Sequence, residues 1–291
     1  MGTTSTAAGI AATHALAAVK AVTVLVVLQG SLAAAEPENA PAPTTVSITD
    51  RLPYGREPID YFSDVLRDPV ASLDQRLESA EARLEAVPEH GYLPALLKTL
   101  NIPLESQLLV YSKTARNPER VSPQTPRAIY FNDDVTVAWI PGTRDLELTA
   151  VDPAKGVNFY TLAQPMVDAD EASPVAQQGP RFVRRDRCLA CHAGRSSIEV
   201  PGLLLRAFQT DKTGKPLQGF SRQTHEMEYS KRWGGWYVQG LPTGFEHRGN
   251  LISSDDNERH RREAGFRSSI KSLSEIFDAG RYLADSSTIV A

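Results

Sequence analysis

The chain has 291 residues, enough to bury a substantial core as one large domain or two modest ones. Its 41% hydrophobic and 23% charged residues are ordinary for a globular protein, which excludes a disordered chain and a multi-span membrane protein. The formal net charge of −4 argues against nucleic acid as a partner.

The first 35 residues differ in kind from the rest. They contain no Asp or Glu and one Lys, Lys20, followed by an apolar run over 21–28 and small residues at 33–35. A basic start, an apolar centre and a small-residue cleavage site are typical of a secretory signal peptide. The alternative, an uncleaved anchor, would need about 20 apolar residues to span a bilayer. We therefore expect cleavage after Ala35, an exported or periplasmic protein, and peripheral or no membrane association afterwards.

The rest of the chain divides into three segments. Proline, threonine and glutamate are frequent over 36–60, which predicts an extended arm. Residues 61–165 are predicted to hold a helical start and an antiparallel sheet. Residues 166–291 contain the cysteine motif described below, and we expect them to form one compact unit with the segment before them.

Two helices are predicted at the start of the second segment. Ser72 and Gln75 have the spacing of a capping box, and leucines at helical spacing extend the first helix to Pro88. A second, short helix is predicted from about Pro94 until 101–103.

The hydrophobic pattern changes from helical to alternating at residue 107. Strands are predicted at 108–111, 128–131, 135–140, 146–148 and 157–162. Consecutive strands joined by short turns indicate an antiparallel sheet, so the predicted fold class is α+β with helices flanking the sheet. A further strand is predicted at 200–209 and a last helix at 268–277.

The two cysteines of the chain stand in the sequence Cys188-Leu189-Ala190-Cys191-His192. This CxxCH spacing is typical of covalent haem attachment, in which both sulfurs bond to the haem and the histidine binds its iron. The alternatives are a thioredoxin-like redox motif, half of a zinc site and a local disulfide. A zinc site would need more ligands nearby, and a thioredoxin-like motif would follow a buried strand, whereas the basic stretch 181–187 precedes this one. We expect one covalent haem c, with His192 as the proximal iron ligand.

The second axial ligand of the iron decides the function, because a second strong ligand favours electron transfer and an open position permits chemistry. The residues weighed for this position are His90, His225, His247, His260, Met166 and Met227. His225 and His247 are favoured, with Met227 behind them, because they flank the Arg-Trp-Gly-Gly-Trp-Tyr run at 232–237. Indole faces and glycine backbone suit a flat cofactor, although a tight turn between buried strands is the alternative for this run.

A haem also brings two propionate carboxylates that need cations or water. The arginines considered for them are Arg184, Arg185, Arg187, Arg195, Arg222 and Arg232. Arginine suits this role because its guanidinium can bind a carboxylate with two parallel hydrogen bonds. The arginines of 181–187 could instead steer an acidic redox partner protein.

The motif at 188–192 resembles that of c-type cytochromes, but the predicted sheet does not resemble the small all-helical cytochrome c domain. Four further stretches, 126–135, 200–202, 232–238 and 247–250, are similar to a group of secreted bacterial monohaem cytochrome-like proteins. That resemblance covers most of residues 105–290. It implies haem binding and export, and it implies no substrate.

The function we expect is therefore haem binding and electron transfer by a periplasmic monohaem c-type cytochrome, a carrier rather than a catalyst. The alternative is a peroxidase- or oxidase-like enzyme with an open distal iron position. In that enzyme His225 or His247 would transfer protons, and Arg222 or Arg232 would polarise the bound oxygen species. A sensor would need an output domain, and the sequence shows none after residue 200.

Overall fold

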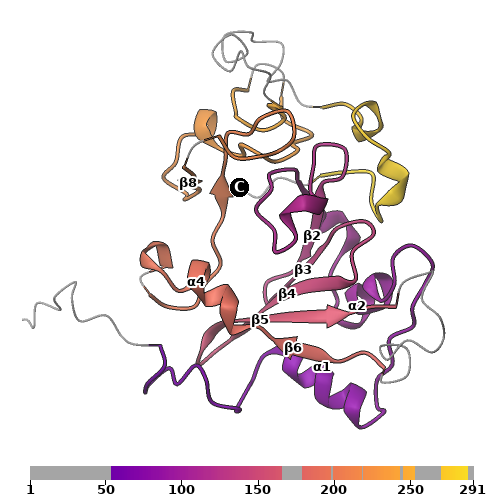
Figure 1. The fold of residues 1–291 in the computed structure, drawn as a ribbon, viewed down its shortest axis with the longest axis vertical. Helices are drawn as coiled ribbons and strands as arrows, with labels where there is room; N and C mark the ends of the chain where they lie inside the picture. Colours follow the sequence, from indigo (N-terminus) through magenta and orange to yellow (C-terminus); the bar gives the residue numbers. More distant parts are fainter. Residues whose placement is uncertain are drawn as a thin grey trace, which may run out of the picture. The chain divides into compact units, whose positions relative to one another are not determined.

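Six strands form one antiparallel sheet in which neighbours in sequence are neighbours in space (Figure 1). They are β1 (Leu108–Val110), β2 (Arg127–Phe131), β3 (Val135–Trp139), β4 (Asp145–Asp152), β5 (Gly156–Ala163) and β6 (Phe182–Arg184). Short turns join β2 to β5, longer connections lead into β2 and β6, and the antiparallel sheet with its few helices confirms the predicted α+β class. The sixth strand was not predicted, and it occupies part of the basic stretch 181–187.

The structure, a computed structural model, describes residues 54–165, 179–197, 199–217, 219–242, 245–252 and 270–287. These residues belong to one compact unit, Ile48–Ala291. The expected signal peptide and most of the expected arm lie outside the described residues. No helix in the part of the chain described here is long and apolar enough to cross a membrane.

Alternation along the strands gives the sheet two different faces. Val135, Val137 and Trp139 of β3 are buried in the main core, together with the alternate residues of β2 and β4. The residues between them, such as Thr136 of β3 and Thr149 of β4, point to the opposite face. The hydroxyl oxygens of these two threonines lie 2.6 Å apart. The second face is therefore partly polar, and the functional site lies against it.

Helix α1 (Pro69–Glu78) covers the core face and contacts β4 and β6. The predicted capping box at Ser72 is wrong, because Asp68 is the N-cap: its Oδ1 accepts hydrogen bonds from the backbone N–H groups of Val70 and Ala71. A proline at the first helical position reinforces this start. The helix also ends well before Pro88, since Ala80 adopts a positive φ of 60°.

Helix α2 (Leu93–Thr99) agrees with the predicted second helix. The predicted strand at 200–209 is reduced to β7 (Arg206–Ala207), which pairs with β8 (Ser221–Arg222) in a separate ribbon. The predicted last helix is absent from 270–277, where the chain forms only a 3₁₀ turn at Leu273–Glu275. Leu273 of this turn and Phe277 just after it have helical spacing and are nevertheless buried in the main core, so the periodicity indicated burial and not helix.

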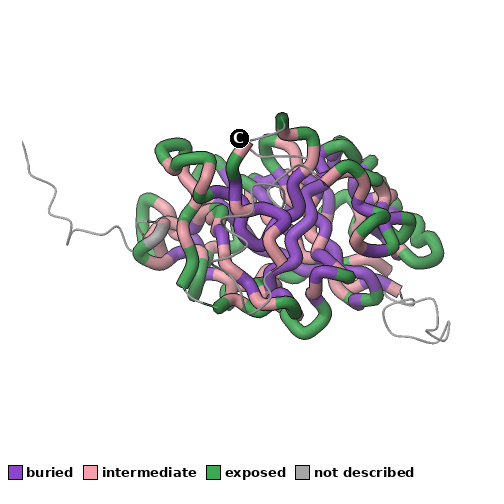
Figure 2. Tube along the Cα trace, turned by 90° about the horizontal axis from the view of Figure 1, so that it is seen from above, coloured by how far each residue is buried: buried purple, intermediate pink, exposed green. Residues whose placement is uncertain are grey.

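A smaller core lies beneath the cysteine motif. It contains Tyr61, which directly follows the predicted arm, Val157 and Phe159 from β5, and Leu189 and Ala193 from the motif segment. The Tyr61 hydroxyl donates a hydrogen bond to the Val157 carbonyl. Figure 2 shows that the buried stretches gather toward the middle of the described trace, while exposed stretches lie mostly at its outer loops. The motif is therefore packed onto the sheet through β5.

Candidate functional site

A cavity of about 790 Å³ lies against the second face of the sheet. One wall consists of sheet residues that alternate with core residues, including Arg127, Ile129, Glu147 and Phe159. The other wall is formed by the chain from Val200 onward, together with the cysteine motif. The volume falls within the range of roughly 300–1,000 Å³ that is usual for cofactor and small-molecule sites.

The cysteine motif lies at the edge of this cavity. Asp186–Cys188 forms a 3₁₀ turn that leads into the four-residue helix α4 (Leu189–His192). Cys188 is half-buried and lines the cavity, whereas Cys191 is exposed, and both are free thiols. Burial raises the pKa of the Cys188 thiol, and the negative charge of Glu147 adds to this effect. The structure therefore places one sulfur inside the cavity and the other at the surface.

His192 lines the same cavity in a fixed orientation. Its Nδ1 donates a hydrogen bond of 3.0 Å to the carbonyl oxygen of Gly202, and its ring centroid lies 4.7 Å from that of Phe159. Burial lowers the pKa of His192, which favours the neutral imidazole. With Nδ1 held by a carbonyl, Nε2 is the nitrogen left to bind a metal, which is the usual arrangement for a metal-binding histidine.

The segment that holds His192 is itself fixed to the sheet. The N–H of Val157 donates a hydrogen bond of 3.1 Å to the Pro201 carbonyl. Gly156 has a φ of +84°, and a Cβ at this position would lie 2.5 Å from the same carbonyl oxygen. Glycine is required here both by the backbone conformation and by the close approach of Pro201.

The two histidines predicted for the distal position occupy different places. His225 lines the cavity with a side chain that is 93% exposed, and its Nε2 lies 3.9 Å from a Glu226 oxygen. His247 is fully buried against Trp233, with ring centroids 5.9 Å apart, and it does not line the cavity. The structure therefore brings only His225 to the cavity that holds Cys188 and His192.

Met227 and His90, which were also weighed for that position, do not line the cavity. Met227 is half-buried outside it. The Nε2 of His90 lies 3.0 Å from the Arg281 carbonyl, and its ring packs against Trp139. His260 and Met166 lie outside the described residues.

The Trp-Gly-Gly-Trp run forms a backbone junction, as the turn alternative predicted. A Cβ on Gly234 would lie 2.7 Å from the Phe208 carbonyl oxygen, and one on Gly235 would lie 2.8 Å from the Ser112 Cβ. The space beside these glycines is therefore occupied by neighbouring segments of the chain and not by a cofactor. Trp236 does line the cavity, and its Nε1 donates a hydrogen bond of 2.9 Å to the Arg206 carbonyl.

Three of the arginines expected to meet propionates or a partner have structural contacts instead. The guanidinium of Arg184 donates to the carbonyls of Tyr61 and Ser63, and that of Arg185 donates to the Thr161 hydroxyl. Arg232 is buried and donates to the carbonyls of the loop that carries His225. Of the arginines considered, Arg222 lines the cavity.

Sequence reasoning missed several charged residues of the cavity wall. Arg116, Arg127, Arg206 and Glu147 line it. For Arg127 and Glu147 a signal was present, because both stand between core residues of alternating strands and must therefore occupy the non-core face. Arg116 and Arg206 carry no such periodic signal.

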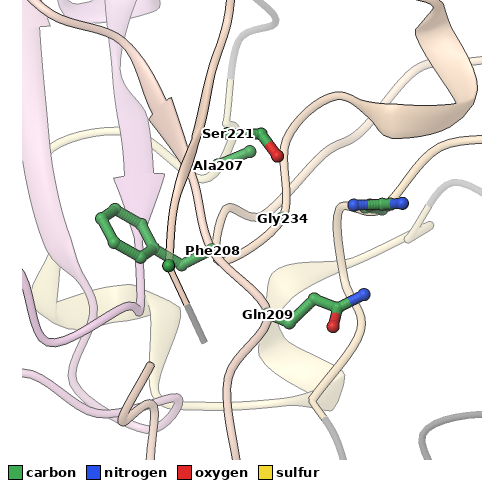
Figure 3. A pocket seen from close by; sticks show the side chains of 7 residues that line it. Ala207, Phe208, Gln209, Ser221 and Gly234 are labelled. Carbon is green, nitrogen blue, oxygen red and sulfur yellow. The ribbon is translucent and has the colours of Figure 1, made fainter. Parts of the chain in front are cut away.

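A second, smaller cavity of about 240 Å³ lies on the other side of the β7–β8 ribbon. Ala207 and Ser221, which are opposite one another in the ribbon, line it together with Gln209 and Gly234 (Figure 3). Arg206 and Arg222, the other opposed pair, line the large cavity. Strand alternation thus directs the two opposed pairs to different cavities, while Phe208 lines both, and of these two cavities the large one contains the cysteine motif.

The large cavity fits the haem group that the motif predicts: it provides a thiol, an oriented imidazole and a mostly apolar wall with cationic groups. No group of three or more His, Cys, Asp or Glu side chains in the described part of the chain could hold a metal ion by itself. A haem iron needs only axial ligands from the protein. Comparison of the chain with family models, curated proteins and solved structures found no match.

Proposed function

We propose that this chain is an exported monohaem c-type cytochrome that transfers electrons to or from a redox partner protein in the periplasm. One observation carries the proposal. Cys188 and His192 line one cavity of suitable volume, and the Gly202 carbonyl holds Nδ1 of His192 so that Nε2 is left for the iron.

The two cysteines suit an electron carrier because of their different exposure. Cys188 is half-buried at the cavity and Cys191 is exposed. A group bonded to both sulfurs would extend from the interior to the surface, where a partner can approach it. Haem c supplies a reversible one-electron couple, and the protein adjusts it through the axial ligands, burial and hydrogen bonds.

Within this proposal, His225 is the distal ligand of the haem iron. It lines the cavity, whereas His247 is buried beyond Trp233. The side chain of His225 is almost fully exposed, so it can change rotamer without displacing core residues. Coordination by two histidines would favour a low reduction potential.

A second candidate function is a peroxidase- or oxidase-like enzyme. Among the described residues that line the cavity, only His192 and His225 are histidines and none is methionine. A distal position left open by the exposed His225 would permit exogenous ligands to bind. Arg127 and Glu147 would then lie in the same cavity as groups able to polarise a ligand or move a proton.

The decisive experiment begins with protein produced in a host that attaches haem c. The mature protein is expected to carry the mass of one haem and to show a Soret band, and Cys188→Ser with Cys191→Ser should abolish covalent attachment. A ferric spectrum that is low-spin and unchanged by cyanide or peroxide supports electron transfer. A high-spin spectrum with rapid ligand binding supports the enzyme. A correctly matured chain without haem would refute both.

A further inference from the structure

The guanidinium of Arg127 is the least satisfied charged group in the cavity wall. Its side chain is 16% exposed, and its Nε is buried without a hydrogen-bond partner in the described structure. Its one ion pair, between Nη1 and Oε2 of Glu147, spans 3.7 Å, which is too long for a hydrogen bond. A guanidinium offers five N–H donors, so most of its capacity is unused in the described structure.

The neighbourhood makes this arrangement costly unless an anion binds there. Glu147 is shared, because its Oε1 also lies 3.9 Å from Nε of Arg116. Arg116 also pairs with Asp145. The single negative charge of Glu147 is therefore divided between Arg127 and Arg116. Burial lowers the pKa of Arg127, while the charge of Glu147 opposes that effect. A buried cation held by one long ion pair is poorly compensated.

The rest of the cavity is also positively charged. Four arginines and one glutamate line it. Arg206, a second arginine with a buried and unpartnered Nε, has other contacts, because its Nη2 donates to the Cys191 carbonyl and its guanidinium stacks on Phe220 at 4.4 Å. Arg127 has no comparable contact among the described residues. The group most in need of a ligand therefore lies on the sheet, at β2.

Small side chains keep the space beside Arg127 open. Ala138 of β3 lies opposite Glu147 of β4 in the sheet, and Ala138 also lines the cavity. Its methyl group allows Arg127 of β2 and Glu147 of β4 to meet across β3. Thr136 and Thr149 line the same wall, and their hydroxyls are hydrogen-bonded to each other, so the hydroxyl that accepts in this pair can donate to an oxyanion.

We propose that Arg127 is the anchor of a carboxylate- or oxyanion-binding site in the cavity wall, with Glu147 as a competing internal anion. The anion has two possible sources, a propionate of the haem itself or a small diffusible oxyanion. Binding of a propionate rests on the proposed function, because it requires haem, whereas binding of a diffusible oxyanion does not. In either case the anion supplies the hydrogen-bond acceptors that Glu147 provides only at a distance.

The test compares Arg127→Gln, Arg127→Lys and Glu147→Gln in the mature full-length protein. Each variant is titrated with inorganic phosphate and with acetate by isothermal calorimetry. Each is also examined by resonance Raman spectroscopy of the propionate bending band and by redox potentiometry. Arg181→Gln is the matched control, because Arg181 is exposed, pairs with Glu78 and does not line the cavity.

If the anion is a small diffusible one, phosphate or acetate should bind the wild type, and the affinity of Arg127→Gln should be lower by about tenfold or more. Arg127→Lys should bind with intermediate affinity, and Glu147→Gln should bind more tightly because the competing carboxylate is gone. If the anion is a haem propionate, Arg127→Gln should shift the propionate band and lower the reduction potential, because a positive charge near the haem is lost. Glu147→Gln should shift both quantities in the opposite direction.

The proposal is overturned if Arg127→Gln behaves as Arg181→Gln both in the anion titrations and in the Raman and redox measurements. It is also overturned if Glu147→Gln and Arg127→Gln change the anion affinity, the propionate band or the reduction potential in the same direction. The latter result would indicate disruption of the sheet. A protein that lacks haem would refute the proposed function, and the calorimetric titration of that same protein would still decide whether Arg127 binds anions.

Discussion

His192 and Gly202 are joined by two hydrogen bonds of 3.0 Å, one from the ring Nδ1 to the Gly202 carbonyl and one from the Gly202 N–H to the His192 carbonyl. The pair fixes both the backbone and the ring of His192 to a segment ten residues further along the chain. That segment is in turn fixed to β5 through Pro201 and Val157. The orientation of the proposed iron ligand therefore depends on the start of β5.

Gly156→Ala should disturb this connection. The new Cβ would lie 2.5 Å from the Pro201 carbonyl oxygen, so the segment that holds His192 must move. We expect loss of stability in urea unfolding together with a changed haem absorption spectrum. Gly142→Ala is the control, because Gly142 also has a positive φ, +76°, but has nothing within 4 Å.

The control should lose about 1 kcal/mol from backbone strain alone and leave the spectrum unchanged. Gly156→Ala should lose about 1 kcal/mol more, since the displaced carbonyl also gives up its hydrogen bond from Val157. Equal losses in the two variants with unchanged spectra would show that Pro201 does not position His192.

Replacement of His225 and His247 should have opposite consequences. His225→Ala removes an exposed side chain that lines the cavity, so it should convert a low-spin spectrum to high-spin and leave the melting temperature nearly unchanged. His247→Ala creates a void beside Trp233 and should cost about 2 kcal/mol of stability with little spectral change. A low-spin spectrum retained in His225→Ala and lost in His247→Ala would contradict the assignment of His225.

Asp68→Ala should be among the most destabilising single changes in α1. Its Oδ1 caps the helix, and its Oδ2 accepts hydrogen bonds of 2.8 Å from Asn158 and 2.6 Å from the Tyr160 hydroxyl. Loss of the cap and of two buried hydrogen bonds should cost about 3 kcal/mol in chemical denaturation.

Ser72→Ala tests the same helix as a control. Ser72 is exposed inside α1, so alanine should be neutral or slightly stabilising there. A larger loss from Ser72→Ala than from Asp68→Ala would instead support the capping box that the sequence suggested.

Asp152 should contribute stability that depends on pH. Burial raises its pKa, but hydrogen bonds from the backbone N–H groups of Arg67, Ala154 and Lys155 outweigh this and leave the pKa below its usual value. A carboxyl whose pKa is lowered on folding stabilises the protein above the unfolded pKa of about 3.9. That contribution is lost as the pH falls through the folded pKa.

Asp152→Asn should therefore be less stable than the wild type at pH 7, and the difference should shrink as the pH falls below about 4. Unfolding free energies measured by urea titration across the acid range check this. The control is Asp133→Asn, because Asp133 is exposed in the turn between β2 and β3. A difference between Asp152→Asn and the wild type that stays constant with pH would contradict the prediction.

The sequence by itself determined the sheet and the composition of the motif. Period-two alternation in the segments now seen as β2 to β4 requires one buried face, and the short turns that join β2 to β5 require antiparallel neighbours. The CxxCH spacing is local, so it needed no tertiary information. The covalent haem it predicts stays a prediction.

Tertiary structure decided which residues share the cavity. Arg127 and His225 come from distant parts of the chain, and only folding places them in the cavity that Cys188 and His192 line. It also decided that His247 packs against Trp233, and that the Phe208 backbone and the Ser112 side chain occupy the space beside Gly234 and Gly235. Local patterns specify which face of an element is buried, whereas the partner across a cavity depends on packing between segments far apart in sequence.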